Sequence, residues 1–342
     1  MQPSYWYCSC SANGSIVGFR FDAASGALET LGVTLIPNAQ SATKSVPLAL
    51  AGGRMLYAAV RSTPTRIAGF RIGADGTLAF AGSAPTAGSL AYLTSDASGR
   101  FLLGASLPDS LVLCQRIEAH GAPGEPLQVV RGVAGAHSIV LDADNSHAYA
   151  AARDEGVIRA FHFDARLGML APGAPPRTRI HTGAGPRHLA LHPSRTLLLC
   201  LNETDGTLTA LRVDPHSGAL DPGKTVAVPI AAAARPANVR TADLAITPNG
   251  RFAYATERTT STMTTFHVDA AGTVEVIETR PVEASPRGIR MSDDGRWLAV
   301  AGELSGRLCV YAVDASSGAL IEHGRHRAGP GANWIVMTQA SD

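Results

Sequence analysis

The sequence predicts an all-β protein, a β-propeller of seven blades. Short β-rich segments separated by Gly, Asp, Asn and Pro recur along the 342 residues. Related units begin at intervals of 42 to 56 residues. The chain also ends in a lone first strand and begins with the strands that would complete its unit. A period of roughly 40 to 50 residues with four strands per unit is typical of β-propellers.

The clearest unit begins at Gly185, where apolar segments alternate with turn residues. Thr204-Asp205-Gly206 and Asp214 to Gly218 are the turn sequences between its later strands. The pattern predicts strands over residues 189–192, 197–201 and 208–213, and a fourth strand that begins at Ala219-Leu220.

The other units follow the same pattern around the predicted ring. Their first residues lie near Val46, Gly88, Gly135, Gly185, Thr241 and Ser285. The seventh unit is split, because its first strand begins near Gly331 and its other three strands are expected at 5–10, at 15–21 and from Ala27 onward. Such a split joins the two chain ends and leaves no open sheet edge. We therefore expect one propeller domain over residues 1–342.

Composition excludes several function classes. The hydrophobic content of 45%, the charged content of 17% and a formal net charge of +1 predict a well-buried protein without general attraction to nucleic acid or to a membrane surface. No apolar stretch reaches the roughly 18 residues that a membrane span needs. The N-terminus lacks the pattern of a signal peptide, which predicts a cytoplasmic location. The sequence leaves the oligomeric state open.

The five cysteines fit a reducing compartment, because their number is odd and their spacing forms no disulfide framework. Cys8 and Cys10 alternate along a strand, so we expect both thiols to pack on one apolar side rather than to bind a metal. No zinc, calcium or nucleophile-elbow motif occurs in the sequence. We expect no metal and no cofactor.

Charged residues recur at two equivalent positions of the blades. The position that closes the second strand is occupied in turn by Arg61, Leu107, Arg153, Glu203, Arg258 and Glu303. The position that opens the first strand, from the third unit onward, is occupied by His137, Arg187, Ala242, Arg287 and Asn333. In an antiparallel meander the first strand begins where the second ends, so both sets should meet at one mouth of the channel. The longest connection, residues 222–240, is expected to be a loop over one face.

The arginines at this mouth outnumber the carboxylates, which favours an anion-binding site, because guanidinium groups bind carboxylate or phosphate in bidentate fashion. A structural ring of ion pairs is the alternative. We expect Asp243 to orient an arginine. The predicted substrate-binding residues are Arg61, Arg153, His188, Asn202, Asp243, Arg287 and Glu303.

Several segments resemble the lactonase family of seven-bladed β-propellers. They are GAHS at 135–138, GAGPRHLALHP at 183–193, CLNE at 200–203, ADLAITPNGRFAYATERT at 242–259, SPRG at 285–288 and YAVDASSGAL at 311–320. The resemblance covers nearly the whole chain. It implies cytoplasmic lactone hydrolysis without a required metal, and it places the catalytic residues at His137, Arg187, Glu203 and Arg258.

Lactone hydrolysis needs a base for the attacking water and positive charge for the oxyanion. Glu203 or His137 would be the base, and Arg187 and Arg258 would hold the oxyanion and the anionic substrate. The leading substrate is 6-phosphogluconolactone. Unphosphorylated aldono- or hexaro-lactones and a muconolactone remain alternatives, and a non-catalytic propeller scaffold is a more distant one.

Overall fold

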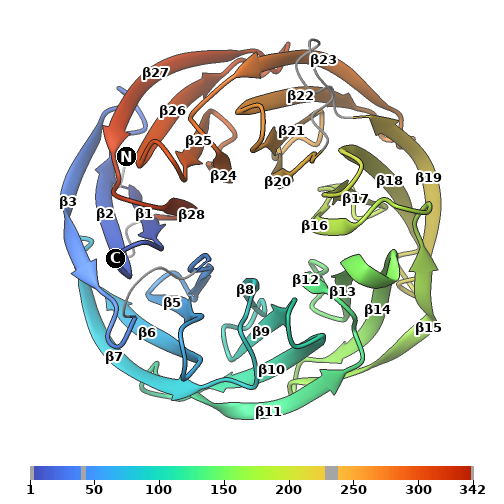
Figure 1. The fold of residues 1–342 in the computed structure, drawn as a ribbon, viewed down its shortest axis with the longest axis horizontal. Helices are drawn as coiled ribbons and strands as arrows, with labels where there is room; N and C mark the ends of the chain where they lie inside the picture. Colours follow the sequence, from blue (N-terminus) through green and yellow to red (C-terminus); the bar gives the residue numbers. More distant parts are fainter. Residues whose placement is uncertain (1–3, 40–43, 228–237, 340–342) are drawn as a thin grey trace.

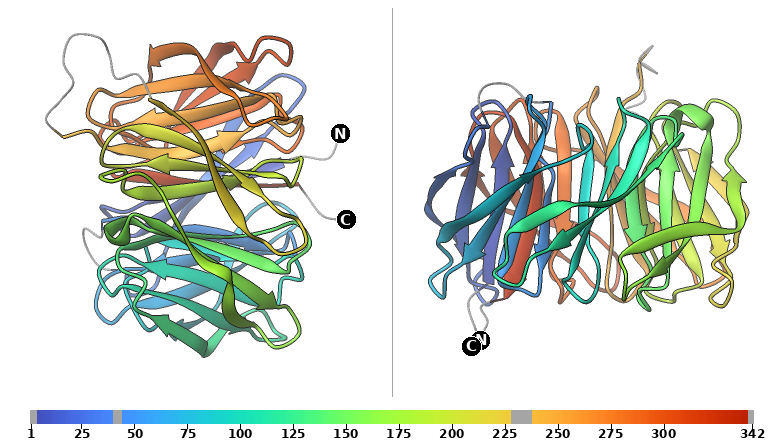
Figure 2. Two further views of the ribbon diagram at one scale, coloured as in Figure 1. Left: turned by 90° about the vertical axis from the view of Figure 1, so that its right-hand side faces the viewer. Right: turned by 90° about the horizontal axis from the view of Figure 1, so that it is seen from below.

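A computed structural model describes residues 4–39, 44–227 and 238–339 of the chain. Seven four-stranded antiparallel sheets stand around a central channel, as Figure 1 shows. The side view in Figure 2 shows that the ring is flatter than it is wide. The predicted seven-bladed β-propeller is confirmed. In the described residues, no helix is long and apolar enough to cross a membrane.

Each sheet runs from an innermost strand at the channel to an outermost strand at the rim. The innermost strands are β4 (Leu48–Ala51), β8 (Tyr92–Ser95), β12 (Ala136–Leu141), β16 (Pro186–Leu191), β20 (Thr241–Ile246), β24 (Pro286–Met291) and β28 (Ala332–Gln339). The second strands are β5 (Met55–Val60), β9 (Phe101–Ser106), β13 (His147–Ala152), β17 (Leu197–Asn202), β21 (Phe252–Glu257), β25 (Trp297–Gly302) and β1 (Ser4–Cys10).

The third strands are β6 (Arg66–Ile72), β10 (Leu111–Ile117), β14 (Val157–Asp164), β18 (Thr207–Val213), β22 (Thr262–Val268), β26 (Arg307–Val313) and β2 (Ser15–Phe21). The outermost strands are β7 (Leu78–Pro85), β11 (Pro123–Arg131), β15 (Met169–Arg179), β19 (Leu220–Ala227), β23 (Val274–Pro281), β27 (Leu320–Arg327) and β3 (Leu28–Leu35). One 3₁₀ helix, η1 (Arg153–Glu155), follows β13.

The ring closes through the split blade that the sequence predicts. Strand β1 pairs with β2 on one side and with the C-terminal β28 on the other, both antiparallel. Asn333 ties this blade to the next one, since its Oδ1 accepts the backbone N–H of Val46 at 3.1 Å. The closure therefore combines a strand ladder with a buried side-chain hydrogen bond across the blade boundary.

Most of the interior lies between neighbouring sheets, where small aliphatic side chains fill the layers. Cys8 and Cys10 are buried in one of these layers and are unpaired, as predicted. Buried tyrosines also link adjacent blades: the hydroxyl groups of Tyr7, Tyr57 and Tyr254 donate to backbone carbonyls of Gly76, Gly121 and Gly318 at 2.8 to 2.9 Å. These bonds satisfy a polar group that burial would otherwise penalise.

A β-bulge recurs at the entrance of the innermost strands. His137, Arg187, Arg287 and Asn333 each occupy a position where the strand register shifts and the residue has no partner in the second strand. In β20 the same shift sets Ala242 and Asp243 opposite the single residue Thr256. A bulge leaves the extra residue unpaired and redirects its side chain. The repeated bulge thus fixes the side chains at one end of the channel.

Two predicted boundaries are wrong for physical reasons. The first strand of the clearest unit begins at Pro186, three residues before the predicted Leu189, because the bulge at Arg187 interrupts the alternation of apolar and polar residues. The predicted loop over 222–240 is wrong at its start, since residues 222–227 continue the outermost strand β19. Residues 228–237 of that predicted loop lie outside the described residues.

Candidate active site

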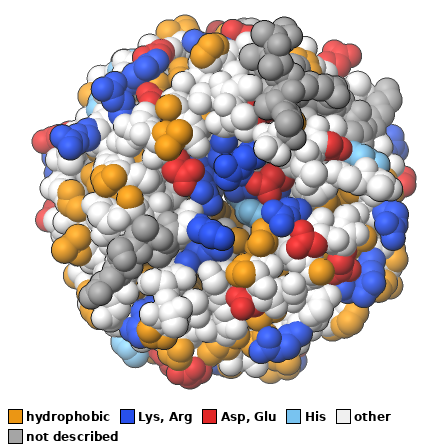
Figure 3. All heavy atoms as spheres, in the orientation of Figure 1, with side chains coloured by type: hydrophobic (Ala, Val, Ile, Leu, Met, Phe, Trp, Pro, Cys, Tyr) orange, Lys and Arg blue, Asp and Glu red, His pale blue; other side chains and the backbone are white. Residues whose placement is uncertain are grey.

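Charged side chains gather around the centre of one face of the ring (Figure 3). Arg61, Arg153, Glu203, Arg258 and Glu303 each come directly after the last residue of a second strand. His137, Arg187 and Arg287 occupy the bulges where the innermost strands begin. The structure brings the two sets together at one mouth, which we call the arginine mouth.

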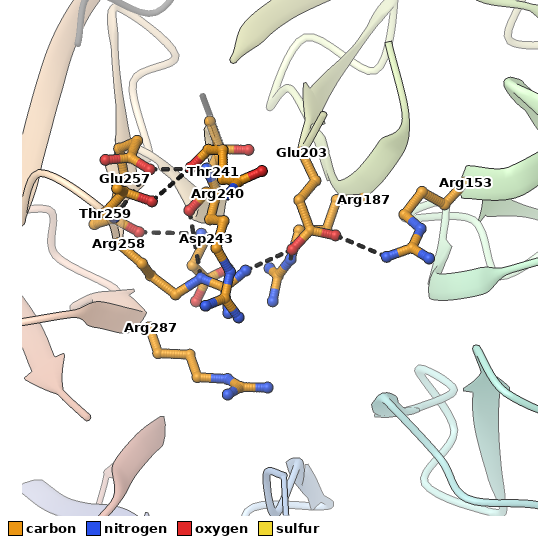
Figure 4. A network of polar contacts seen from close by, with 12 residues as sticks. Arg153, Arg187, Glu203, Arg240, Thr241, Asp243, Glu257, Arg258, Thr259 and Arg287 are labelled. Carbon is orange, nitrogen blue, oxygen red and sulfur yellow. Dashed lines mark hydrogen bonds and ion pairs between the residues drawn. The ribbon is translucent and has the colours of Figure 1, made fainter. Parts of the chain in front are cut away.

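Glu203 is the centre of an ion-pair network at this mouth (Figure 4). Its Oε2 accepts a hydrogen bond from Arg153 Nη1 at 3.2 Å. Its Oε1 binds Arg258 Nη2 at 2.5 Å and lies 3.5 Å from Arg187 Nε. Burial alone would raise the pKa of the Glu203 carboxyl group, but Arg187 and Arg258 outweigh burial and lower the pKa. Glu203 is therefore an ionised carboxylate with both oxygens engaged.

The turn after β21 positions Arg258. The buried carboxylate of Glu257 accepts backbone N–H groups from Thr259, Thr260 and Arg240. Arg258 in turn donates its backbone N–H to the carbonyl of Arg240 at 3.0 Å. Arg240 was not predicted as a site residue, because it ends a long connection and has no equivalent in the repeat. Its positive charge nevertheless contributes to lowering the pKa of both Arg187 and Arg258.

The nearby carboxylates offset only part of the positive charge of the arginines at this mouth. Burial first, and then neighbouring arginines, lower the pKa of Arg258 to about 9 and that of Arg61 to about 10. Burial is also the largest cause that lowers the pKa of Arg187 to about 10. In the described structure, Nη1 of Arg187 is buried without a hydrogen-bond partner. Each of these groups would gain from a bound anion.

Arg61 differs from the other arginines in its partners. Its Nε donates to the hydroxyl group of Ser89 at 3.0 Å and its Nη1 to that of Ser45 at 2.8 Å. Arg287, by contrast, forms an ion pair with Glu303 at 2.5 Å. Among the described residues, no carboxylate lies within ion-pair distance of Arg61, so neutral hydroxyl groups hold its guanidinium in place.

His188 and Asp243 form a buried pair beneath the arginines. His188 Nδ1 lies 2.7 Å from Asp243 Oδ1, while Asp243 Oδ2 accepts the backbone N–H of Ile289 at 2.9 Å. Asp243 therefore orients a histidine, and the expectation that it orients an arginine is wrong. The bulge in β20 explains the difference, because it turns Asp243 toward the neighbouring strand β16. Burial, followed by the charge of Arg187, lowers the pKa of His188 to about 4, so this imidazole is neutral.

Aromatic rings pack against one another below the arginine mouth. The ring of His188 has its centroid 5.3 Å from Tyr92, 5.4 Å from His137 and 5.8 Å from Trp334. On the other side, Tyr92 borders a cavity of about 450 Å³ that opens at the far ends of β16, β20 and β24. Tyr92 and Trp334 were not predicted as site residues, because only the charged positions of the repeat indicated the site.

Asn202 lies apart from this constellation. Its side chain is fully buried, and its amide nitrogen donates to the hydroxyl groups of Thr207 at 2.8 Å and Thr209 at 3.0 Å. The strand alternation accounts for this placement, since Asn202 is the last residue of β17 and Glu203 is the first residue beyond it. Its amide stabilises the strand pair β17–β18 and is already occupied.

Fold and site together define a seven-bladed β-propeller with an anion-binding mouth. The family model described as "Lactonase, 7-bladed beta-propeller" matches residues 5–337. The chain belongs to this lactonase family.

Curated relatives and solved structures agree with this membership. A protein of Erwinia tasmaniensis named 6-phosphogluconolactonase is 35% identical over 286 residues, which cover 83% of this chain and 84% of the relative. One of Serratia proteamaculans with the same name is 34% identical over 319 residues, 92% of each chain. A periplasmic gluconolactonase structure of Pseudomonas aeruginosa superposes with a TM-score of 0.88 at 22% identity, over 99% of both chains. At that identity the last likeness concerns the fold alone.

Proposed function

We propose that this protein hydrolyses 6-phosphogluconolactone to the open acid. The observation that carries the proposal is the surplus of arginines at the mouth, most clearly Arg187 Nη1, which is buried and has no hydrogen-bond partner among the described residues. Such a surplus is stabilised by an anionic ligand. The names of the curated relatives at 33 to 36% identity support the same substrate.

Arg61 is the best candidate to bind the phosphate group. Among the described residues, its guanidinium donates to the hydroxyl groups of Ser45 and Ser89 and has no carboxylate within ion-pair distance, although the charge of Asp109 acts on it from farther away. A phosphate would therefore supply a directly contacting anionic partner. Arg287 and Arg187 lie close enough to Arg61 for their charges to lower its pKa. A phosphate between these guanidinium groups would offset that repulsion.

Arg187 and Arg258 are placed to stabilise the oxyanion of lactone hydrolysis. Attack of water on the ester carbonyl develops negative charge on the carbonyl oxygen, and preorganised cations stabilise that charge in the transition state. Glu203 holds both guanidinium groups through one oxygen, which fixes them before substrate binds. Arg153 holds the other oxygen and completes the arrangement.

The site favours catalysis over a scaffold role. Protein-binding surfaces expose aromatic and apolar side chains at their centre. Here the centre of the face is charged (Figure 3), and His137 and His188 are buried beneath the arginines, at 8% and 2% exposure. A charged mouth of this kind suits a small anionic molecule.

A lactonase assay tests the proposal. Purified, chelator-treated protein is given freshly prepared 6-phosphogluconolactone, gluconolactone or glucarolactone, each measured against its spontaneous hydrolysis. We expect selective acceleration of the phosphorylated lactone. A preference for glucarolactone would indicate that the substrate is the lactone of a sugar diacid. Failure to accelerate the hydrolysis of any of the three lactones would contradict the proposed activity.

A further inference from the structure

A cavity of about 410 Å³ lies between the third and fourth blades, on the face opposite the arginine mouth. The two blades are β12–β15 and β16–β19, which are neighbours in the ring (Figure 1). The turns that join β12 to β13 and β16 to β17 border the cavity, and they lie at the strand ends farthest from that mouth. Three residues at this cavity depart from the repeat. The lining includes Leu141, His147, Tyr149, Leu191, Pro193 and Val213.

The hydroxyl group of Tyr149 is the first departure. It is fully buried and has no hydrogen-bond partner among the described residues. Tyr7, Tyr57 and Tyr254 occupy the same position in their second strands, and each donates to a glycine carbonyl of the next blade at 2.8 to 2.9 Å. A buried donor without an acceptor is costly, so a ligand that accepts this bond would stabilise the site.

His147 is the second departure. Its Nδ1 lies 2.8 Å from Asp142 Oδ2. An ionised carboxylate accepts hydrogen bonds, so the neutral ring carries its proton on Nδ1, and Nε2 is left as the acceptor. At the same position, beneath a glycine of the next blade, the other blades place large apolar or aromatic side chains: Tyr5, Met55, Phe101, Leu197, Phe252 and Trp297.

Arg195 is the third departure. It lies in a turn with a left-handed backbone, at a φ of 65°. Its Nη1 lies 2.7 Å from Asp144 Oδ1, so the ion pair joins the fourth blade to the third at the exposed rim of the cavity. The equivalent turns use residues that adopt this backbone with less strain: Gly53, Gly99, Asn145, Gly250 and Gly295.

The charges around the cavity favour an uncharged ligand. Asp142 and Asp144 line it together with the cation Arg195, so a bound anion would meet a net negative lining. Both carboxylates are already engaged, Asp142 by His147 and Asp144 by Arg195, so a cation would gain no free partner. This charge balance is the reverse of the one at the arginine mouth.

The polar groups of the lining favour a hydroxyl group on the ligand. Burial, followed by the charges of Asp142 and Asp214, raises the pKa of Tyr149, which keeps its hydroxyl group a donor. Tyr149 needs an acceptor and His147 Nε2 needs a donor, and a hydroxyl group has both capacities. The leucine, valine and proline side chains of the lining offer apolar contact to a ring, and the volume is within the usual range for small-molecule sites.

We infer that this cavity is a second ligand site, which takes an uncharged aromatic alcohol of the phenol class whose hydroxyl group accepts from Tyr149 and donates to His147. The site is separate from the arginine mouth in position and in charge. The inference does not rest on the proposed lactonase function, and binding tests it without any measurement of activity.

Titration of the full-length protein with phenol, followed by ligand-observed NMR, tests the inference. We expect a dissociation constant of about 1 mM or tighter, as suits so small a molecule. Tyr149→Phe should weaken phenol binding about five- to tenfold and leave binding of fluorobenzene, which lacks the hydroxyl group, unchanged. Tyr254→Phe is the matched control, because its hydroxyl group is already bonded to Gly318, and should change neither. No phenol binding, or equal binding by Tyr149→Phe and the wild type, would overturn the inference.

A second pair of variants locates the bound probe. Ala143 is exposed on the turn that borders the cavity, and Ala97 is exposed on the equivalent turn of the preceding blade. Ala143→Phe should fill the entrance and weaken binding of phenol and fluorobenzene at least about tenfold, whereas Ala97→Phe should leave both unchanged. Phenol binding that Ala143→Phe does not alter would place the probe elsewhere and contradict the assignment.

Thermal unfolding without any ligand tests the state of the Tyr149 hydroxyl group. Tyr254→Phe removes a buried hydrogen bond and should lower Tm by several degrees, whereas Tyr149→Phe removes a hydroxyl group without a protein partner and should lower Tm by less. An equal fall in Tm would mean that Tyr149 is already bonded in the free protein, to a structural water or to a backbone carbonyl, and would overturn the inference.

Discussion

Glu203 and Arg258 form an ion pair in which both partners are largely withdrawn from solvent. The side chain of Arg258 is 4% exposed and that of Glu203 is 15% exposed. The same carboxylate also neutralises part of the charge of Arg187 and Arg153. One acidic residue therefore holds together three arginines whose mutual repulsion would otherwise oppose folding of the arginine mouth.

Glu203→Gln should destabilise the protein and make its stability depend on anions. Removal of the carboxylate leaves buried guanidinium groups without their partner, which costs about 3 kcal/mol of unfolding free energy. Inorganic phosphate should restore more stability in the variant than in the wild type, because it supplies the missing negative charge. Chemical denaturation with and without phosphate measures both effects. Equal stability of the two proteins would mean that Glu203 does not hold the arginines.

Stability should decline as pH falls below about 6.5, in part because of His188. Burial and then the charge of Arg187 lower the pKa of His188 to about 4 in the folded protein. Between pH 6.5 and pH 4 this histidine therefore binds a proton in the unfolded chain but not in the folded one. The unfolded state then binds more protons, so unfolding free energy is lost at up to about 1.4 kcal/mol per pH unit as pH falls from 6.5 toward 4. The groups that face His188 are Arg187, Asp243, Glu203, Tyr92 and His137.

His188→Gln removes this contribution and should reduce the slope of unfolding free energy between pH 6.5 and pH 5. The slope should not vanish, because burial and neighbouring arginines also lower the pKa of His137, which both proteins keep. Unfolding free energies of wild type and variant, measured by denaturant titration at several pH values, provide the comparison. Parallel curves for the two proteins would show that His188 is not a buried neutral imidazole.

Asn202→Ala should affect stability without affecting substrate binding. The substitution removes hydrogen bonds to Thr207 and Thr209 inside the sheet, which costs about 1 to 3 kcal/mol. We expect KM for the lactone to stay within roughly twofold of the wild type, since the amide lies inside the sheet. A raised KM at unchanged stability would show that Asn202 binds substrate, as the sequence predicted.

The repeat made the fold predictable, and the repeat also limited what could be predicted of the site. Equivalent positions such as Arg187 and Arg287 were found because polar or charged residues recur where several blades begin. Arg240 was missed because it lies at the end of a connection that the other blades lack. Tyr92 was missed because a neutral ring on an innermost strand gives no charge signal.

The hydrogen-bond partners of site residues could not be predicted from the sequence, and the reason is geometric. Whether Asp243 faces an arginine or His188 depends on a one-residue register shift in β20, which alternation patterns do not show. The same shift in β16 moved the beginning of that strand from the predicted Leu189 to Pro186. Bulges that aim functional side chains also disrupt the periodicity from which strands are predicted.

Substrate preference tests most directly whether the arginine mouth recognises phosphate. The measurement compares kcat/KM for 6-phosphogluconolactone with kcat/KM for gluconolactone, as a ratio, in the wild type and in Arg61→Gln. The wild type should strongly favour the phosphorylated lactone. In Arg61→Gln the ratio should fall by about tenfold or more, because the guanidinium held by Ser45 and Ser89 no longer meets the phosphate. An unchanged ratio, or a wild-type preference for the unphosphorylated lactone, would contradict the account.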